Sequence, residues 1–281
     1  MNIQRIRGTI VVTGALFLIV AASYAEGNQE QAGHSGDYGT FTSLRVEIPA
    51  EVTLLQGETN RVQADIPRRW RDRLVIRNER GTLVIDERRN QLFSLTTDKP
   101  RFTITMPTME NLTLSGSAEL RSEDRWEGEQ IDISLSGSGR MRLAALSAER
   151  VEATVSGSGS LGIAEVEALQ VRLRSSGSGE LVAGRLRCEE VDLRSSGSGD
   201  INLAVETGVL DASSSGSADL SLRGRVETLR LGTSGSGTVR GEELFAASAE
   251  IRMSGSGDVT LQEGSGVTTV RSSGSGNFSL R

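Results

Sequence analysis

The sequence predicts an all-β protein built as a parallel β-helix, a solenoid with about 20 residues per coil. Two observations predict this fold. A serine-glycine tetrapeptide recurs nine times at a nearly constant spacing, and around each copy apolar residues alternate with polar ones. Alternation at every second residue is typical of a β-strand, and internal repeats of about 20 to 50 residues are typical of solenoids.

The first 25 residues are organised like a secretory signal peptide. Arg5 and Arg7 form a basic start, residues 8–22 are apolar, and small residues surround Ala25. The apolar stretch of 15 residues is shorter than the roughly 20 that a membrane-spanning helix needs. We therefore expect cleavage after Ala25, no transmembrane segment in the mature chain, and a periplasmic, secreted or cell-surface protein.

Residues 26–40 are polar and glycine-rich, which predicts a flexible linker. The single histidine, His34, lies in this segment and is expected to be a solvent-exposed linker residue. Residues 41–281 are then expected to form a single β-helix domain. Its first part, 41–110, contains strand-like segments without the repeat, such as 44–48 and 82–85, and is predicted to be irregular first coils and a cap.

Residues 111–281 contain nine Ser-Gly-Ser-Gly or Ser-Gly-Ser-Ala coils. The tetrapeptides begin at Ser115, Ser136, Ser156, Ser176, Ser196, Ser215, Ser234, Ser254 and Ser273, at intervals of 21, 20, 20, 20, 19, 19, 20 and 19 residues. An antiparallel meander would not keep every copy in the same phase, because its hairpins reverse direction. Stacked coils keep that phase, and the handedness rule for parallel crossovers favours a right-handed coil.

Two apolar columns flank the tetrapeptide in all nine copies. One lies three residues before the first serine and runs from Leu112 to Val270, and the other lies five residues after it and runs from Leu120 to Phe278. Both columns lie at odd offsets from the first serine, together with the glycines, whereas the even offsets carry serines and charged residues. Odd offsets should therefore face the core and even offsets the solvent.

A column of charges lies four residues before each first serine. Successive coils bring mixed signs together at Glu152–Arg172–Asp192 and at Asp211–Arg230–Glu250. If the coils stack in register, these side chains are opposite-charge neighbours across the strands, which stabilise a sheet. The last tetrapeptide is followed by little further chain. We expect its coil to present an open strand edge through which the protein could form a homo-oligomer.

The composition excludes several kinds of chemistry. With one cysteine, Cys188, the chain cannot form an intrachain disulfide, and with one histidine it has too few ligands for a Cys/His zinc site. A Ser-His-Asp triad would need His34 as its imidazole, and the polar segment around His34 disfavours that role. Cys188 lies in a turn-like run, residues 185–190, and is expected to be a bystander. The net charge of −6 argues against a nucleic-acid partner. We expect no catalytic, metal-binding or cofactor-binding residues.

The outward serines are the candidate binding face. Those at the first and third positions of each tetrapeptide should form two parallel files of hydroxyl groups, about 4.8 Å apart from coil to coil. A flat array of this kind suits a repetitive ligand such as a glycan, although serine and glycine also suit a tight corner. With two acidic neighbours, the candidates are Ser136, Ser138, Ser156, Ser158, Ser176, Ser178, Ser196, Ser198, Asp200, Ser234, Ser236, Ser254, Ser256 and Asp258.

Three other motifs are weaker candidates. Residues 157–162 read G-x-G-x-x-G but lack the helix that would bind a phosphate. The Gly-Ser-Gly-Asp runs resemble calcium-binding nonapeptide repeats, but the period here is about 20. Outward carboxylates such as Glu180 and Asp219 form one repeated column without a converging second set, which glycoside hydrolysis would require.

Several segments together resemble a known family, the bacterial putative auto-transporter adhesin head (GIN) domain family. They are residues 44–52, the strands 81–85 and 101–107, and the run 112–117, and the resemblance extends over about 41–281. A literal Gly-Ile-Asn is absent, and the nearest run is residues 199–202. The resemblance implies an exported, adhesin-like β-helical domain with no established catalytic residues.

These observations predict an exported, non-enzymatic, adhesin-like binding module of the cell envelope, whose partner is a glycan or another envelope component. Two alternatives remain open: a β-helix enzyme that acts on polysaccharides, and a purely structural envelope protein. Retention of a glycan without release of reducing sugar would favour the binding module, and release would favour the enzyme.

Overall fold

The computed structural model describes residues 33–88 and 98–281, which belong to one compact unit. These residues contain an 18-stranded, hydrogen-bonded sheet and one short 3-10 helix. Within them, no helix has the length and apolar character needed to cross a bilayer. The predicted signal peptide, residues 1–25, lies outside the described residues, as does the predicted linker up to residue 32.

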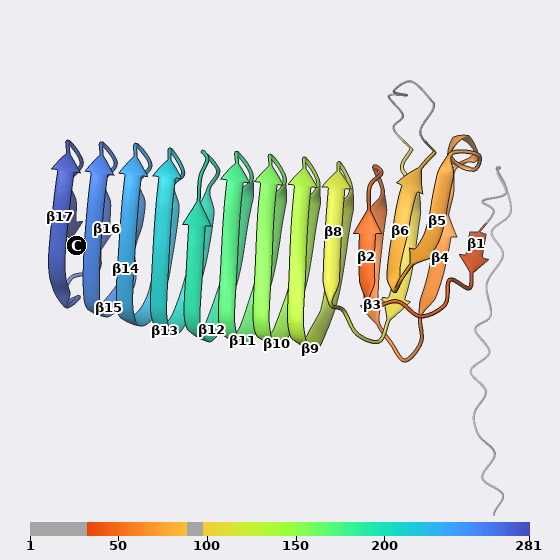
Figure 1. Ribbon diagram of the computed structural model, residues 1–281, viewed down its shortest axis with the longest axis horizontal. Helices are drawn as coiled ribbons and strands as arrows, with labels where there is room; N and C mark the ends of the chain where they lie inside the picture. Colours follow the sequence, from red (N-terminus) through yellow and green to blue (C-terminus); the bar gives the residue numbers. More distant parts are fainter. Residues whose placement is uncertain (1–32, 89–97) are drawn as a thin grey trace, which may run out of the picture. The chain divides into compact units, whose positions relative to one another are not determined.

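The repeated part of the chain forms strands that follow one another through the stack. They are β8 (Asn111–Gly116), β9 (Glu119–Gly137), β10 (Arg140–Gly157), β11 (Ser160–Gly177), β12 (Glu180–Ser195), β13 (Ile201–Gly216), β14 (Leu220–Gly235), β15 (Val239–Gly255), β16 (Val259–Leu261), β17 (Val267–Gly274) and β18 (Phe278–Leu280). Each pairs in parallel with its successor in the stack (Figure 1). The predicted parallel solenoid is confirmed.

The register of the coils follows the sequence period. Met141 of β10 lies beside Leu161 of β11, and Leu161 lies beside Leu181 of β12. At the bends Gly157 lies beside Gly177. Equivalent positions of successive copies therefore stack directly on one another, as the equal phase of the repeats predicts.

Each Ser-Gly-Ser-Gly tetrapeptide forms a tight bend, and the bends line one edge of the stack (Figure 1). The backbone N–H of Ser158 donates to the carbonyl of Gly137 at 2.9 Å, and Ser178 donates to Gly157 in the same way. The first glycine of most bends has a positive φ, for example 112° at Gly157, which side chains rarely adopt. Glycine is thus required by the backbone of the bend.

The core is a continuous column of apolar side chains inside the coils. Leu112 and Leu120 are at most 2 % exposed, and so are their counterparts through Ile251 and Val259. The prediction that odd offsets face inward is confirmed for these two columns, whereas the first glycines of the bends are half-buried or exposed. It fails at the outermost coil, where Val270 is 40 % exposed, because no further coil covers it among the described residues. Self-association through this coil stays a prediction.

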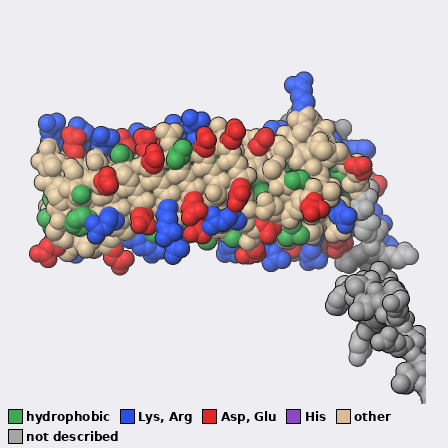
Figure 2. All heavy atoms as spheres, turned by 90° about the horizontal axis from the view of Figure 1, so that it is seen from below, with side chains coloured by type: hydrophobic (Ala, Val, Ile, Leu, Met, Phe, Trp, Pro, Cys, Tyr) green, Lys and Arg blue, Asp and Glu red, His purple; other side chains and the backbone are tan. Residues whose placement is uncertain are grey.

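The edge opposite the tight bends consists of broad bends in which the strands continue without interruption. Residues 185–190 were expected to be turn-like, but they lie inside β12. The prediction was wrong because parallel pairing of Arg187 and Cys188 with Glu206 and Thr207 keeps the backbone extended around the corner. Figure 2 looks onto these bends and shows acidic and basic side chains interspersed along both margins.

The N-terminal part consists of shorter elements. They are β1 (Gly33–Gly36), β2 (Ser43–Val46), β3 (Glu51–Gln56), β4 (Arg61–Asp65), η1 (Arg68–Trp70), β5 (Leu74–Glu79), β6 (Thr82–Glu87) and β7 (Arg101–Met106). β2 lies between β6 and β8, and β3 lies between β7 and β9, all in parallel pairs. The chain therefore folds back outward after β3 before it returns to start the repeats.

Antiparallel strands cover the outer end of this part. β4 pairs with β7, and β5 pairs with β6. β1 pairs with β4 and places His34 beside Ala64. Residues 33–36 thus form a strand within the segment in which the sequence predicts a linker, because the edge of β4 offers them backbone partners.

Candidate functional site

The first serines of the tetrapeptides stack as a file along the tight-bend edge. Ser136, Ser156 and Ser176 lie beside one another in register, and so do Ser234, Ser254 and Ser273. The hydroxyl of Ser136 donates to that of Ser115 at 3.1 Å. Ser136 and Ser156 are half-buried, whereas the other first serines on the candidate face are exposed.

The third serines of the tetrapeptides form the second file. Ser138, Ser158, Ser178 and Ser198 are all exposed, as are Ser236 and Ser256. Their backbone N–H groups donate hydrogen bonds to glycine carbonyl groups of the preceding coil. Their hydroxyl groups therefore extend from a bend whose backbone is fixed by these bonds. The structure brings the predicted serines together in two files.

One of the two acidic members of the candidate face, Asp258, has a local hydrogen-bond partner. The Oδ1 atom of Asp258 accepts a hydrogen bond from the backbone N–H of Asn277 at 2.8 Å. Asp200 is exposed in the same column. In that column, the backbone N–H of Thr238 and the guanidinium of Arg240 lower the pKa of Asp219. Residues 33–88 and 98–281 hold no group of three or more His, Cys, Asp or Glu side chains placed to bind a metal.

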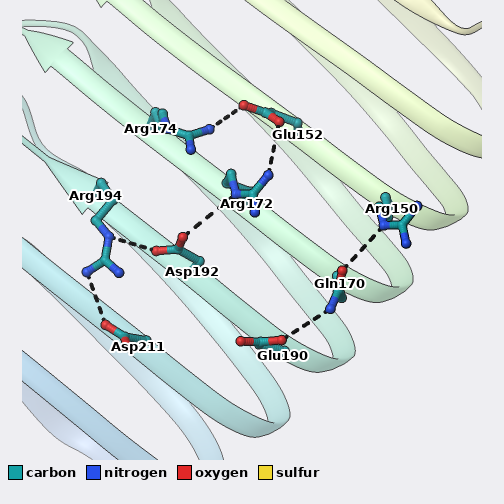
Figure 3. Close-up of polar contacts among 9 residues, drawn as sticks. All are labelled: Arg150, Glu152, Gln170, Arg172, Arg174, Glu190, Asp192, Arg194 and Asp211. Atoms are coloured by element: carbon teal, nitrogen blue, oxygen red, sulfur yellow. Dashed lines mark hydrogen bonds and ion pairs between the residues drawn. The ribbon is translucent and has the colours of Figure 1, made fainter.

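A charged groove of about 260 Å³ lies on the strand face that precedes the tight bends. Its lining comes from β9 to β13 and consists of Gln130, Asp132, Arg150, Val151, Glu152, Gln170, Val171, Arg172, Glu190, Asp192, Arg194 and Asp211. Two rows of contacts cross the coils in this groove (Figure 3). In one row, Arg150 donates to Gln170 at 3.4 Å and Gln170 donates to Glu190 at 3.3 Å.

The other row contains the predicted charge column. Arg172 lies 3.5 Å from Glu152 and 3.7 Å from Asp192, so this predicted trio is confirmed. Arg174 also pairs with Glu152, and Arg194 bridges Asp192 and Asp211 (Figure 3). These additional arginines lie two residues further along their strands, and their length lets them reach across a coil.

The second predicted trio stacks in register but is not ion-paired. Asp211 lies beside Arg230, and Arg230 lies beside Glu250. Asp211 nevertheless pairs with Arg194 at 3.1 Å, and Glu250 pairs with Arg252 at 2.6 Å. Neither carboxylate comes within 4.0 Å of Arg230 in the described part of the chain. Asp211 is thus paired with an arginine of the preceding coil, and Glu250 with an arginine of its own strand, instead of with Arg230.

An open hollow of about 420 Å³ adjoins the serine file near the last coils. Ser234, Ser254 and Ser273 line it, together with Arg252 and Arg271. Sequence reasoning identified the serines but missed the two arginines. The signal was present, because both arginines lie two residues before a first serine and therefore on the outward side.

Cys188 lies in the broad bend and away from these surfaces. It is half-buried, and burial raises the pKa of its thiol. Its Sγ atom lies 3.7 Å from the hydroxyl oxygen of Thr207. A thiol with a raised pKa is mostly protonated near neutral pH and is a weak nucleophile.

The family model described as "Putative auto-transporter adhesin, head GIN domain" matches residues 40–209 and 190–281. The chain belongs to this family. The GIN-domain assignment agrees with the resemblance carried by the segments between residues 44 and 117. A search of curated proteins gave no significant match.

Solved structures share the fold of this GIN-domain protein. A putative lipid binding protein from Parabacteroides distasonis has a TM-score of 0.70 at 15% identity, over 89% of this chain and 96% of that one. A putative adhesin from the same species has a TM-score of 0.70 at 16% identity, with the same coverage. A putative adhesin from Parabacteroides merdae has a TM-score of 0.61 at 14% identity, over 91% of this chain and 98% of that one. At these identities the likeness shows the fold.

Proposed function

We propose that this chain is an exported, non-enzymatic binding module of the cell envelope that holds a repetitive glycan along the serine files. The observation that carries the proposal is the hollow where three stacked serines meet two arginines. Hydroxyl groups at a constant spacing suit a polymer with regularly spaced hydroxyl groups, and guanidinium groups suit its acidic substituents. The adhesin names of the family and of two solved structures support a binding role.

The long file matters because a repetitive ligand can engage several coils at once. Each contact with an exposed hydroxyl is weak, since it replaces a contact with water. Contacts repeated along one rigid surface add through a high effective concentration. An extended polymer should therefore bind far more tightly than one of its repeating units.

The proposal is tested by pull-down with peptidoglycan and by a glycan array, with release of reducing sugar measured on the same samples. Ser234→Leu and Ser254→Leu should abolish retention of the bound glycan, because each replaces a hydroxyl group in the hollow by a bulky apolar side chain. Asn202→Leu, on the opposite strand face, is the matched control and should bind normally. Retention that survives both serine changes would overturn the proposal.

The same measurement separates the alternatives. Reducing-sugar release would favour a polysaccharide-acting enzyme. The absence of both retention and release would favour a structural envelope protein.

The organisation of residues 1–25 supports export. N-terminal sequencing of the mature protein should therefore begin at Glu26. A mature protein that retains Met1 would contradict export through this signal.

A further inference from the structure

A patch of arginine side chains lies on the strand face that follows the tight bends, opposite the charged groove. Arg121 of β9 and Arg140 and Arg142 of β10 line a hollow of about 430 Å³ with parts of β3 and β7. All three arginines are exposed. The whole chain is acidic, with a net charge of −6, so this local excess of positive charge is a property of the fold.

Two of these arginines stack directly on each other. Arg121 lies beside Arg142 in the parallel register, at the ordinary strand spacing of about 4.8 Å. Like charges directly opposite each other destabilise a sheet. Arg174 and Arg194 also stack, but carboxylates pair with both of them. In the described residues, no carboxylate lies within 4.0 Å of the guanidinium groups of Arg121, Arg140 or Arg142.

The surroundings keep this patch open. The Nε atom of Arg121 donates to the hydroxyl of Thr53 at 3.4 Å, which leaves its two terminal nitrogens for another acceptor. The nearby carboxylates of Glu51 and Glu119 are paired with Arg101 and Lys99.

Beyond Arg142, the next coil presents Gly162 at the same position. A Cβ atom added there would meet only the carbonyl oxygen of Met141, at 4.0 Å. Nothing at that position fills the hollow or balances the charge of Arg142.

We propose that Arg121, Arg140 and Arg142 form a binding site for a phosphate group. A single guanidinium fork satisfies both oxygens of a carboxylate. A tetrahedral phosphate offers further oxygens, so it can accept hydrogen bonds from two stacked arginines and a third one at once. This site is separate from the serine files, and its ligand could be free phosphate or the phosphate of a lipid headgroup.

The experiment follows the Arg Nε–Hε signals of the mature protein by NMR while inorganic phosphate is added at constant ionic strength. Signals of the three patch arginines should shift. Arg121→Thr or Arg142→Thr should weaken phosphate binding about tenfold, because each removes hydrogen bonds to a charged group. Arg240→Thr is the matched control, since Arg240 has the same outward offset as Arg142 but is paired with Asp219 at 2.9 Å. Binding should be unchanged in this control.

A second arm distinguishes the two sources of phosphate. The protein is sedimented with phosphatidylcholine vesicles in which one lipid in five is phosphatidylglycerol. Retention that Arg142→Thr abolishes identifies a headgroup site, and phosphate binding without vesicle retention identifies a site for soluble phosphate. Both results support the proposal.

Three binding results would overturn it. Chloride at equal ionic strength could shift the same signals equally, the patch variants could bind phosphate like the wild type, or galacturonate could bind as tightly as phosphate. Melting curves of the variants show whether a loss of phosphate binding arises from a loss of stability. Relief of the repulsion between stacked arginines should leave the variants at least as stable as the wild type at low salt. A less stable variant would show that the two arginines stabilise the fold and would contradict the proposal.

Discussion

The first glycine of most tight bends meets two constraints at a single residue. At Gly157, φ is 112°, and a Cβ atom would lie 2.6 Å from the carbonyl oxygen of Gly137 in the preceding coil. Gly264 has a φ of 85°, but a Cβ atom there would meet nothing within 4 Å. The two glycines therefore separate the cost of the backbone conformation from the cost of crowding.

We expect Gly157→Ala to lower the free energy of unfolding by about 3 kcal/mol and Gly264→Ala by about 1 kcal/mol. Both replacements strain the backbone, but only the first forces two coils apart. Urea unfolding followed by circular dichroism measures the difference. Equal losses at the two sites would show that crowding between stacked bends contributes nothing.

Asp219 provides a pH-dependent contribution at the scale of one side chain. The backbone N–H of Thr238 is the main cause that lowers its pKa below the ordinary value of 3.8, and Arg240 adds to it. A lowered pKa in the folded state stabilises the protein above pH 3.8, and this stabilisation is lost as the pH falls through the folded-state value.

We expect Arg240→Gln to raise the pKa of Asp219 only part of the way, because the bond from Thr238 remains. An NMR titration of the Asp219 carboxyl carbon measures this change. A return to the ordinary value in the variant would assign the whole shift to Arg240 and contradict the order of causes.

At the scale of the element, strands β9 to β13 are linked by side chains that cross from coil to coil. Arg172 has a carboxylate on each side, whereas Arg230 occupies the same column without an ion pair to either neighbour within the described residues. Both arginines have similar positions on their strands. Substitutions at the two arginines can therefore be compared to measure what the ion pairs between coils contribute to stability.

We expect Arg172→Gln to lower the free energy of unfolding by less than about 1 kcal/mol, because the side chain is half-exposed and solvent screens its pairs. The loss should shrink as salt is added. Arg230→Gln should leave stability unchanged. Denaturant unfolding at low and high salt measures both changes. A large effect at Arg230 would show that stacking beside carboxylates stabilises the coils without a direct ion pair.

At the scale of the whole molecule, each coil contacts its neighbours in the stack, so stability should be a sum over coils and their interfaces. Deletion of residues 180–199 removes one complete coil and places Ile201 where Leu181 lies beside Leu161. It also brings Asp211 beside Arg172, an opposite-charge neighbour. The remaining coils keep their register.

We expect this deletion to fold, with a strand signal in circular dichroism and a urea m-value reduced in proportion to the removed surface. Deletion of the ten residues 180–189 is the control and should abolish cooperative unfolding, because it stacks a tight bend on a broad one. If both deletions fold equally well, the stacked register does not determine the structure.

The serine files show how far the candidate site could be predicted from residues alone. Their position follows from parity and period, so Ser156 and Ser176 lie where the sequence places them. The groove and the arginine hollows could not be predicted in this way. They depend on which long side chains extend across a coil, as Arg194 does toward Asp211. Several side-chain pairings are compatible with one strand register.

The sequence by itself determined the solenoid, its period and the side of each coil that faces the core. It could do so because alternation is a local pattern and the same pattern recurs in every repeat. The tertiary structure decided the insertion of β2 and β3 between strands that follow them in the chain. It also decided that, among the described residues, no carboxylate pairs with Arg121 or Arg142, whose stacking itself follows from the period. The N-terminal order depends on pairing between distant segments without a repeat. The charge of the patch depends on side chains from different coils that meet only when the stack is complete.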